Sequence, residues 1–399
     1  MRSNAFIIAE YNPFHNGHLY HIEQTKKNGA ENIIVIMSGN YVQRGEGAVI
    51  PKHRRAEAAI IAGADLVLEL PLKYAVSGSG YFAYGALQTA LLTGIDGTLS
   101  FGAESELSVL QKCAEVLCSP AVHEQIKELC RSKGYSYPRA QSIVADEILG
   151  KECSHALSMP NNILAIQYMI ENIRVGSPFD YFAVRRAGVS HDSGEPADGF
   201  MSAKLIREQM ESKMLPGGFI PEFSVDIINE CKKTGTVLSK NRFEVAAISR
   251  LQTLSSQALA EVNGVNHGLE NPLYNAICKG VTLDEIYMAA KSKRYTLSRI
   301  RQVCLSAVLG LTRSDLDRGA DYIGILGFNE KGRALLRKAA AHSSVPFCGL
   351  LSQAFSESSC DRDAEVMRKA EIFYNLCLEK PAADFSPFRL KPFVFRNDQ

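Results

Sequence analysis

Residues 6–18 read Phe-Ile-Ile-Ala-Glu-Tyr-Asn-Pro-Phe-His-Asn-Gly-His, and this stretch sets the architecture that we expect around it. The apolar run from Phe6 to Ala9 predicts a buried strand. Pro13 ends that strand because it lacks a donor N–H, and a helical pattern follows the histidines. Two imidazoles and Gly17 therefore lie in a turn between a strand and a helix. Ligands bind at such turns in open α/β sheets, and the amides of a helix N-terminus suit phosphate.

The rest of the first half alternates strand and helix patterns, which predicts a Rossmann-like parallel sheet of the α/β class. A proline and glycine cluster predicts a domain boundary near residue 215, so that residues 1–215 form one domain and 216–399 a mainly helical one. Further strands are expected at 33–37, 65–70, 98–101, 181–184 and 322–326, helices at 52–62, 79–92 and 330–341, and a helical insertion at about 107–160.

Composition and charge exclude several classes of protein. The chain has 399 residues, of which 46% are hydrophobic and 22% charged, so disorder is not expected. The net charge of +1 means that a nucleic-acid partner would need a local basic patch. The ten cysteines form no CxxC pair, which argues against zinc ribbons and disulfide frameworks. With no signal peptide and no long apolar run, we expect a soluble cytoplasmic protein without a membrane partner.

The pattern His15-x-Gly17-His18 resembles the signature of the HIGH-type nucleotidyltransferase superfamily. The longer string from Glu10 to His18 resembles the bacterial tRNA(Met) cytidine acetate ligase family. The alternative is a helix-capping turn in which the histidines only pack. The resemblance makes the first domain an ATP-binding nucleotidyltransferase domain and implies nucleotide contacts from Ile7, Ile8, Ala9, Glu10, Tyr11, Asn12, Pro13, Phe14, His15, Asn16, Gly17, His18, Leu19 and Tyr20.

A second element, Ser202 to Arg207, resembles the Ile-Ser-Ser-Thr-x-Ile-Arg element of adenylyltransferases. Ser202 is a good helix N-cap, and its helix N-terminus would again meet phosphate. Ala203 and Lys204 replace a serine and a threonine, so one hydroxyl is lost and one cation gained. The resemblance implies that Lys204 and Arg207 hold the β and γ phosphates and act catalytically with the two histidines. The alternative is an N-capped amphipathic helix without a ligand.

Three further positions complete the nucleotide site that the resemblance implies. Gly102 follows a strand, where a glycine lets a nucleotide lie against the backbone. Asn162 would contact ATP through its amide, and Arg185 through its guanidinium. Both belong to doublets, so Asn161 and Arg186 stay as alternates. Without the resemblance, a helix cap and solvated charge would explain these residues as well.

A basic string in the second half is a candidate for binding RNA. Cations and one tyrosine suit an RNA backbone and a stacked base, although a solvated helix start is the alternative. The resemblance favours RNA for Lys291, Lys293, Arg294, Arg299 and Arg301, with Lys331, Arg333, Arg337 and Lys338 as a possible extension. Gln43 and Arg44, in a polar loop after the second strand, are candidates to face substrate or tRNA.

The resemblance implies an enzyme, an ATP-dependent ligase that modifies tRNA. Acetate would attack the α-phosphorus of ATP and expel pyrophosphate, and the acetyl group would pass from acetyl-adenylate to N4 of the wobble cytidine of elongator tRNA(Met), giving N4-acetylcytidine. Magnesium is expected to bridge the phosphates, although the sequence shows no protein metal cluster. Expected partners are therefore ATP, acetate and elongator tRNA(Met).

Two other functions fit the same residues. One is a nucleotidyltransferase of cofactor biosynthesis that acts on a phosphorylated small molecule, which leaves the basic string without a role. The other is a non-catalytic module that binds ATP and RNA. Composition and spacing by themselves indicate neither acetate nor cytidine, and they give no oligomeric state.

Overall fold

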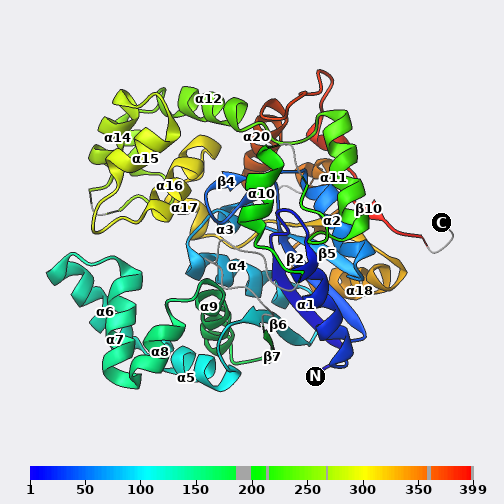
Figure 1. Cartoon of the computed structure of the whole chain (residues 1–399), viewed down its shortest axis with the longest axis horizontal. Coiled ribbons are helices and arrows are strands. Elements are labelled where there is room, and N and C mark those ends of the chain that lie inside the picture. The colour runs from blue at the N-terminus through cyan, green and yellow to red at the C-terminus, as the bar shows by residue number, and fades with distance from the viewer. Residues whose placement is uncertain (186–198, 213–214, 267, 357–360, 397–399) are drawn as a thin grey trace.

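The structure is a computed structural model that describes residues 1–185, 199–212, 215–266, 268–356 and 361–396. At its centre is an eight-stranded sheet with the strand order β10-β8-β5-β2-β1-β6-β7, and β9 pairs with β8 outside this path (Figure 1). The strands of this sheet are β1 (Asn4–Ala9), β2 (Asn32–Ser38), β5 (Leu66–Leu70), β6 (Thr98–Ala103), β7 (Asp180–Arg185), β8 (Ile323–Phe328), β9 (Phe347–Cys348) and β10 (Phe393–Val394). A small hairpin of β3 (Tyr41–Val42) and β4 (Glu46–Gly47) follows β2. The predicted α/β class is confirmed.

Five neighbouring strands, β5, β2, β1, β6 and β7, run parallel, so their carboxyl ends meet at one edge of the sheet. The strand β8 breaks this pattern, because it runs antiparallel to β5 with Leu66 opposite Phe328. The expectation of a parallel sheet is therefore wrong at this pair. A strand that pairs antiparallel with its neighbour does not need the crossover helix that joins two parallel strands. β8 can therefore pair with β5 although it comes much later in the chain.

Alternate residues of the central strands enter two separate hydrophobic cores, as the two-residue period of a strand requires. Phe6 faces one core, whereas Ala5 and Ile7 face the other. The first core is bordered by α4 (Ser79–Leu92), α5 (Leu107–Cys118) and α9 (Pro160–Arg174). The second is bordered by α1 (Asn16–Lys27), α2 (Lys52–Ile61), α10 (Ala203–Glu211) and α11 (Glu222–Thr234). Both faces of the sheet are thus covered.

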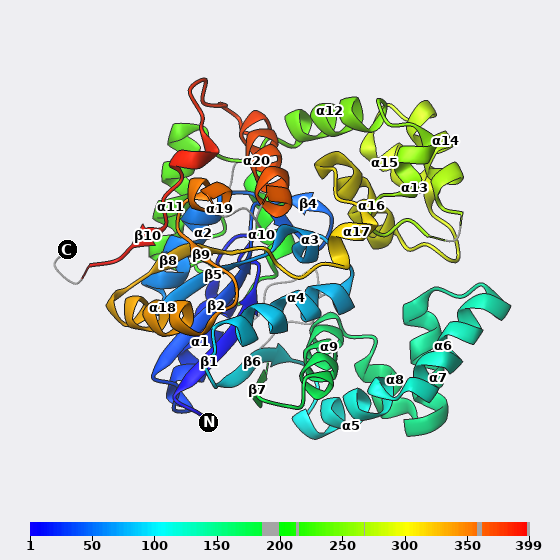
Figure 2. The same ribbon diagram turned by 180° about the vertical axis from the view of Figure 1, so that it is seen from behind.

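The expected helical insertion consists of α5 and three further helices between β6 and α9, namely α6 (Pro120–Lys133), α7 (Tyr137–Leu149) and α8 (Lys151–Ala156). Figures 1 and 2 both show α6 and α7 at the opposite end of the molecule from β10. Figure 2 also shows that α14, α15 and α16 lie on the same side of the sheet region as this insertion.

A third hydrophobic core gathers the helices of the second half. Its residues come from α3 (Leu72–Ala75), α12 (Lys240–Leu251), α13 (Ser256–Ala260), α14 (Glu270–Lys279), α15 (Leu283–Ala290), α16 (Leu297–Leu309) and α20 (Asp361–Leu376). The remaining helical elements are α17 (Arg313–Leu316), α18 (Glu330–His342), α19 (Leu351–Ser356) and the 3₁₀ helix Pro387–Arg389. Across the described ranges, no helix combines the length and the apolarity needed to cross a membrane.

The chain after residue 215 does not leave the sheet, because β8, β9 and β10 all belong to it. Buried charges also tie α20 to the first half. The Lys52 ammonium lies 2.7 Å from the Glu69 carboxylate and 2.9 Å from that of Glu371 on α20. The boundary expected at residue 215 therefore does not separate a sheet domain from a helical one.

Candidate active site

The candidate site begins at the turn between β1 and α1, at the edge where the parallel strands end. Tyr11 has φ +49°, a left-handed conformation that residues other than glycine rarely adopt. Contacts from two distant segments hold this turn. The Asn12 carbonyl accepts a hydrogen bond from Arg207 (2.8 Å), and Asn12 Oδ1 accepts one from the Val49 N–H (2.8 Å). The backbone that leads into α1 is therefore fixed by tertiary contacts.

His15 and His18 form a stacked pair at the N-terminus of α1, with ring centroids 3.8 Å apart. His15 caps the helix, because its Nδ1 accepts a hydrogen bond from the Gly17 N–H (3.0 Å). Nδ1 of His18 accepts one from the His15 N–H (3.2 Å). A neutral imidazole that accepts at Nδ1 carries its proton on Nε2. The backbone therefore sets both rings as Nε2–H donors, the form that suits the oxygens of a phosphate.

Gly17 is required by the approach of the His15 ring. A Cβ atom at residue 17 would lie 2.9 Å from Cε1 and 3.1 Å from Nδ1 of His15. His15 is buried, so its ring has little room to move away. Any side chain at residue 17 would therefore displace the capping histidine.

A second helix N-terminus, that of α10, lines the same cavity. Ser202 caps α10 by accepting a hydrogen bond from the Leu205 N–H (3.3 Å), as the sequence predicts. Arg207 donates a hydrogen bond to the Asn12 carbonyl and lies 3.2 Å from the Glu46 carboxylate. Lys204 is mostly exposed and lies 3.8 Å from Glu208. Two helix N-termini thus face one space, and α10 adds the cationic side chains of Lys204 and Arg207, which is an arrangement suited to a polyanion.

The cavity has a volume of about 1450 Å³, and the loop after β1, the turn between β3 and β4 and the end of β6 meet in it. In the first stretch, the residues that line it are Ile7, Ile8, Ala9, Glu10, Tyr11, Asn12, His15, Gly17, His18 and Tyr20. Four residues expected to contact nucleotide do not line it, namely Pro13, Phe14, Asn16 and Leu19. The reason is packing: the Phe14 ring is buried against Tyr11 and Phe223, and the Asn16 amide donates to the Gly218 carbonyl (2.8 Å).

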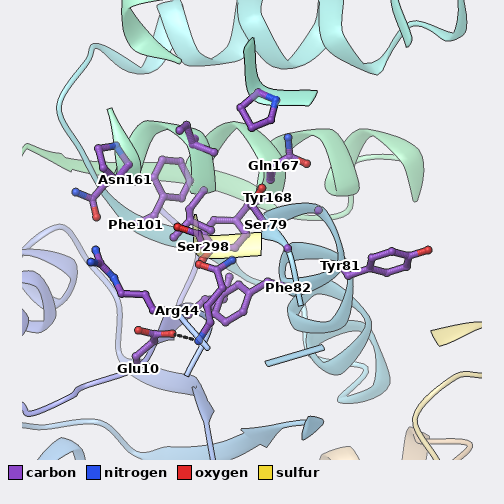
Figure 3. Close-up of a pocket in the computed structure, with 18 of the residues that line it drawn as sticks. Glu10, Arg44, Ser79, Tyr81, Phe82, Phe101, Asn161, Gln167, Tyr168 and Ser298 are labelled. Atoms are coloured by element: carbon purple, nitrogen blue, oxygen red, sulfur yellow. Dashed lines mark hydrogen bonds between the residues drawn. The ribbon is translucent and has the colours of Figure 1, made fainter. Parts of the chain in front are cut away.

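Gly102 and Asn161 lie along the cavity wall, but Asn162 does not. Figure 3 shows Asn161 among the residues drawn around the cavity. The Asn162 side chain is fully buried, and its Oδ1 accepts hydrogen bonds from the Glu104 N–H (2.9 Å) and the Ser105 N–H (3.2 Å). Its amide nitrogen donates to the Ser105 hydroxyl (2.9 Å). The choice of Asn162 as the ATP contact is therefore wrong for a direct role, because it fixes the loop after β6. Asn161, the alternate, faces the cavity.

Arg185 ends β7 at the cavity, with its side chain 85% exposed and 3.8 Å from Glu106. This exposure leaves the guanidinium able to reach a ligand without breaking a strong ion pair. Arg186 lies outside the described residues.

Glu10, at the end of β1, places a carboxylate in this mostly basic surrounding. Its Oε1 accepts a hydrogen bond from the Gln43 N–H (2.7 Å). Burial raises the pKa of Glu10, against the lowering effect of that hydrogen bond and of Arg44 and Arg207 nearby. The Gln43 carbonyl in turn accepts from Gln302 of α16 (2.7 Å), so this corner of the cavity is joined to the second half of the chain.

Of the basic residues predicted to bind RNA, Arg294 and Arg299 line the cavity. Burial lowers the pKa of Arg299, while Tyr295 and Tyr81 nearby raise it. Within the described part of the chain, no carboxylate forms an ion pair with Arg299. A half-buried cation without an acidic partner is costly by itself and is stabilised when an anion binds.

The other three basic residues of the string do not line the cavity. Lys291 and Lys293 are exposed, and Arg301 lies 3.7 Å from Asp284. The expected extension of the patch by Lys331, Arg333, Arg337 and Lys338 is wrong, because α18 packs beside β5 and β8, and Figures 1 and 2 place it well apart from α16.

The opposite wall of the cavity comes from residues that the sequence did not single out. They lie on the insertion helices and at the start of α4. These residues include His123, Lys127, Arg131, Tyr135, Tyr137, Ser79, Gly80 and Tyr81. Tyr81 and Tyr137 are exposed, at 48% and 42%. The mixture of cations and tyrosines within residues 123–139 is the signal that could have identified this wall.

The described residues contain no group of three or more His, Cys, Asp or Glu side chains that could hold a metal ion. These described residues therefore offer no protein cage for a divalent cation. A magnesium ion commonly binds through substrate phosphates and water with few protein ligands, so the residues present are compatible with an ion held mainly by a triphosphate.

Comparison with known proteins gives consistent relatives. The family model of the HIGH Nucleotidyl Transferase matches residues 2–385. A tRNA(Met) cytidine acetate ligase of Thermoanaerobacter sp. (strain X514) is 37% identical over 358 residues, which cover 87% of this chain and 88% of the relative. That of Acetivibrio thermocellus is 32% identical over 401 residues and covers 94% of this chain and 95% of the relative.

Solved structures agree with these relatives. The crystal structure of Thermotoga maritima TmcAL without ligand superposes with a TM-score of 0.91 at 28% identity, covering 99% of this chain and 100% of that one. The structure of the same protein bound with alpha-thio ATP superposes with a TM-score of 0.89 over the same shares of the two chains.

Proposed function

Because the chain belongs to the tRNA(Met) cytidine acetate ligase family of HIGH nucleotidyl transferases, we propose that it uses ATP and acetate to acetylate N4 of the wobble cytidine of elongator tRNA(Met). The observation that carries this proposal is the pair of Nε2–H imidazoles at one helix N-terminus, in the cavity that the α10 N-terminus also lines. The structure of Thermotoga maritima TmcAL bound with alpha-thio ATP supports ATP as a ligand of this fold. We expect the reaction in the cytoplasm.

In the first step, an acetate oxygen attacks the α-phosphorus, and the bond to the β-phosphate breaks to release pyrophosphate. His15 and His18 donate Nε2–H hydrogen bonds to phosphate oxygens as negative charge moves onto the leaving group. Lys204 has the exposure to meet the β or γ phosphate. Arg207 serves in two ways, since it already holds the Asn12 carbonyl and keeps other N–H donors for phosphate.

Magnesium stays part of the proposal. When bound, the ion neutralises phosphate charge. In this chain it would be held by phosphate oxygens and water, since the described residues form no cluster of metal ligands.

In the second step, N4 of the cytidine attacks the acetyl carbonyl, and AMP leaves. The cavity is large enough for more than a nucleotide, because binding sites for drug-sized ligands span about 300–1,000 Å³ and this one measures about 1450 Å³. Its lining includes Arg294 and Arg299 from the segment around the start of α16, and Lys127 and Arg131 from α6. Cations and exposed tyrosines of this kind suit a single-stranded loop whose base is turned out.

The proposal is tested by measuring pyrophosphate release with ATP and acetate, with and without tRNA, and by following labelled acetate into RNA. Release that depends on acetate, with label entering only tRNA(Met), is the expected result. Release that needs a phosphorylated metabolite would favour an enzyme of cofactor biosynthesis, and no release under any condition would favour a binding module.

A substitution in the first turn sharpens this test. His18→Ala removes one of the two Nε2–H donors, and we expect adenylate formation to fall below detection while the protein folds and binds tRNA. Normal turnover in His18→Ala would place the chemistry elsewhere.

A further inference from the structure

In the second step of the proposed reaction, N4 of the cytidine must lose a proton. The cytidine amine carries two hydrogens and the product amide carries one, so a group near the acetyl carbon must accept a proton. This inference rests on the proposed function, and it asks which side chain of the cavity is in a state to accept.

The cavity histidines of the first turn are set as donors. Nδ1 of His15 and Nδ1 of His18 both accept backbone N–H groups, so their Nε2 atoms already carry protons. His21 Nε2 is engaged with the Ser100 hydroxyl at 2.9 Å. His123 lies on the insertion, where its Nδ1 is 3.2 Å from the Tyr137 hydroxyl. The histidines nearest the phosphate site are thus poor acceptors in this arrangement.

Two carboxylates line the cavity within the described part of the chain, Glu10 and Glu171. The Glu171 carboxylate lies 2.5 Å from Arg174, so its charge is already matched. Glu10 forms no ion pair with a described residue, and one of its oxygens is held by the Gln43 N–H. The second oxygen keeps its lone pairs for an incoming donor.

Glu10 also has the right place between the two substrates. It follows β1 directly and lies five positions before His15, so it borders the turn where the adenylate forms. Through Gln43 it is linked to Gln302 on α16, beside the basic residues that face the RNA side of the cavity. Figure 3 shows Glu10 next to Arg44, with Ser298 of α16 among the residues drawn around the same cavity. Burial raises the pKa of this carboxyl group, which makes it a stronger base than an exposed glutamate.

We infer that Glu10 is the general base of acetyl transfer. As N4 attacks the carbonyl carbon, the C–N bond forms and the N4 proton passes to the Glu10 carboxylate. The C–O bond to the phosphate of the adenylate breaks, and its electron pair leaves with AMP. Glu10 then returns the proton to solvent.

Glu10→Gln tests this role, because the amide oxygen of glutamine still accepts from the Gln43 N–H while the basic oxygen is lost. Two rates are measured on the full chain: acetate-dependent exchange of pyrophosphate with ATP, and single-turnover transfer of acetyl from preformed acetyl-adenylate to tRNA(Met). We expect exchange within about threefold of wild type and transfer slower by about 10²- to 10⁴-fold, the usual effect of a general base. Glu31→Gln, at an exposed glutamate that does not line the cavity, is the control and keeps both rates.

The pH dependence of transfer gives a readout that a structural role would not change. The wild-type rate of transfer should rise with pH through a midpoint above 4.5, the ordinary pKa of glutamate, and the Glu10→Gln rate should not.

The inference is overturned if Glu10→Gln transfers acetyl at the wild-type rate, or if it loses exchange and transfer equally. Absence of exchange in the wild type would instead remove the proposed function itself. If Glu10→Gln fails to bind ATP, Glu10→Asp is measured, and equal slowing of both of its rates also overturns the inference.

Discussion

Gly17→Ala is the change that tests the geometry of the histidine pair most directly. The new Cβ would lie 2.9 Å from Cε1 of His15, closer than carbon atoms pack, so the ring must move. That movement breaks the 3.0 Å hydrogen bond from the residue 17 N–H to His15 Nδ1 and separates the two rings, now 3.8 Å apart. The hydrogen bond that sets the proton of His15 on Nε2 is lost at the same time.

The expected effects on stability and on activity differ. Loss of a helix cap costs about 0.5–2 kcal/mol, but alanine is favoured over glycine within a helix by about 1 kcal/mol, so the free energy of unfolding should change by about 1 kcal/mol or less. A displaced donor at a site of developing charge costs about 100- to 1000-fold in rate, equivalent to about 3–4 kcal/mol. We therefore expect a folded protein whose adenylation is slower by about 100-fold.

Acetate-dependent exchange of pyrophosphate with ATP measures the effect on adenylation, and thermal unfolding measures the effect on stability. Gly319→Ala is the control, because a Cβ at Gly319 meets no atom within 4 Å. Exchange by Gly17→Ala within about threefold of wild type would refute the reasoning, since it would mean that the position of the His15 ring does not matter to the chemistry.

Three other outcomes are expected. Asn162→Ala removes the hydrogen bonds that hold the loop after β6, so the free energy of unfolding should fall by about 2–3 kcal/mol. Asn161→Ala should instead weaken ATP binding with little change in melting temperature. Calorimetry and nucleotide titration that find the larger loss of stability in Asn161→Ala and the weaker ATP binding in Asn162→Ala would contradict the assignment. Arg299→Ala should weaken tRNA binding and reduce its salt dependence more than Arg301→Ala, because Arg299 lines the cavity and Arg301 does not, and equal affinities would remove Arg299 from the RNA site. Asp315 forms an ion pair with Arg362 of α20 (2.7 Å). Burial would raise the pKa of Asp315, but hydrogen bonds from Arg362 and Thr312 hold it at about 2, below the ordinary 3.8. This group therefore stabilises the fold above pH 3.8, and its contribution of about 2 kcal/mol is lost as pH falls through 2. Asp315→Asn should flatten the acid side of the stability profile, and an unchanged profile would count against the ion pair.

The sequence predicted the elements whose signals are local. The apolar run before Glu10 gave the first strand, and the histidines and Gly17 after Pro13 marked a turn into a helix, because strand period, proline and capping are properties of a few neighbouring residues. Ser202 was identified as a helix cap for the same reason, and the structure confirms it.

The packing of helices decided the finer assignments. Asn161 and Asn162 differ by one position on α9, so they point about 100° apart, and only the contact of α9 with the loop after β6 decides which one meets the cavity. Arg299 and Arg301 lie two positions apart on α16, so they also point to different faces, and only Arg299 lines the cavity. A run of Lys and Arg in the sequence predicts a basic surface, but it does not predict which face of the helix a ligand can reach.

The chain by itself therefore determined the strand-turn-helix unit and the histidine pair, because these depend on residues close together in sequence. The expected chemistry came from the resemblance of that stretch to a known family. Tertiary structure decided the direction of β8, the contact of Arg207 with Asn12 across 195 positions, and the cavity wall built by the insertion helices. Such contacts depend on how separate elements pack, and the free energy of that packing is spread over many side chains with no short sequence signal.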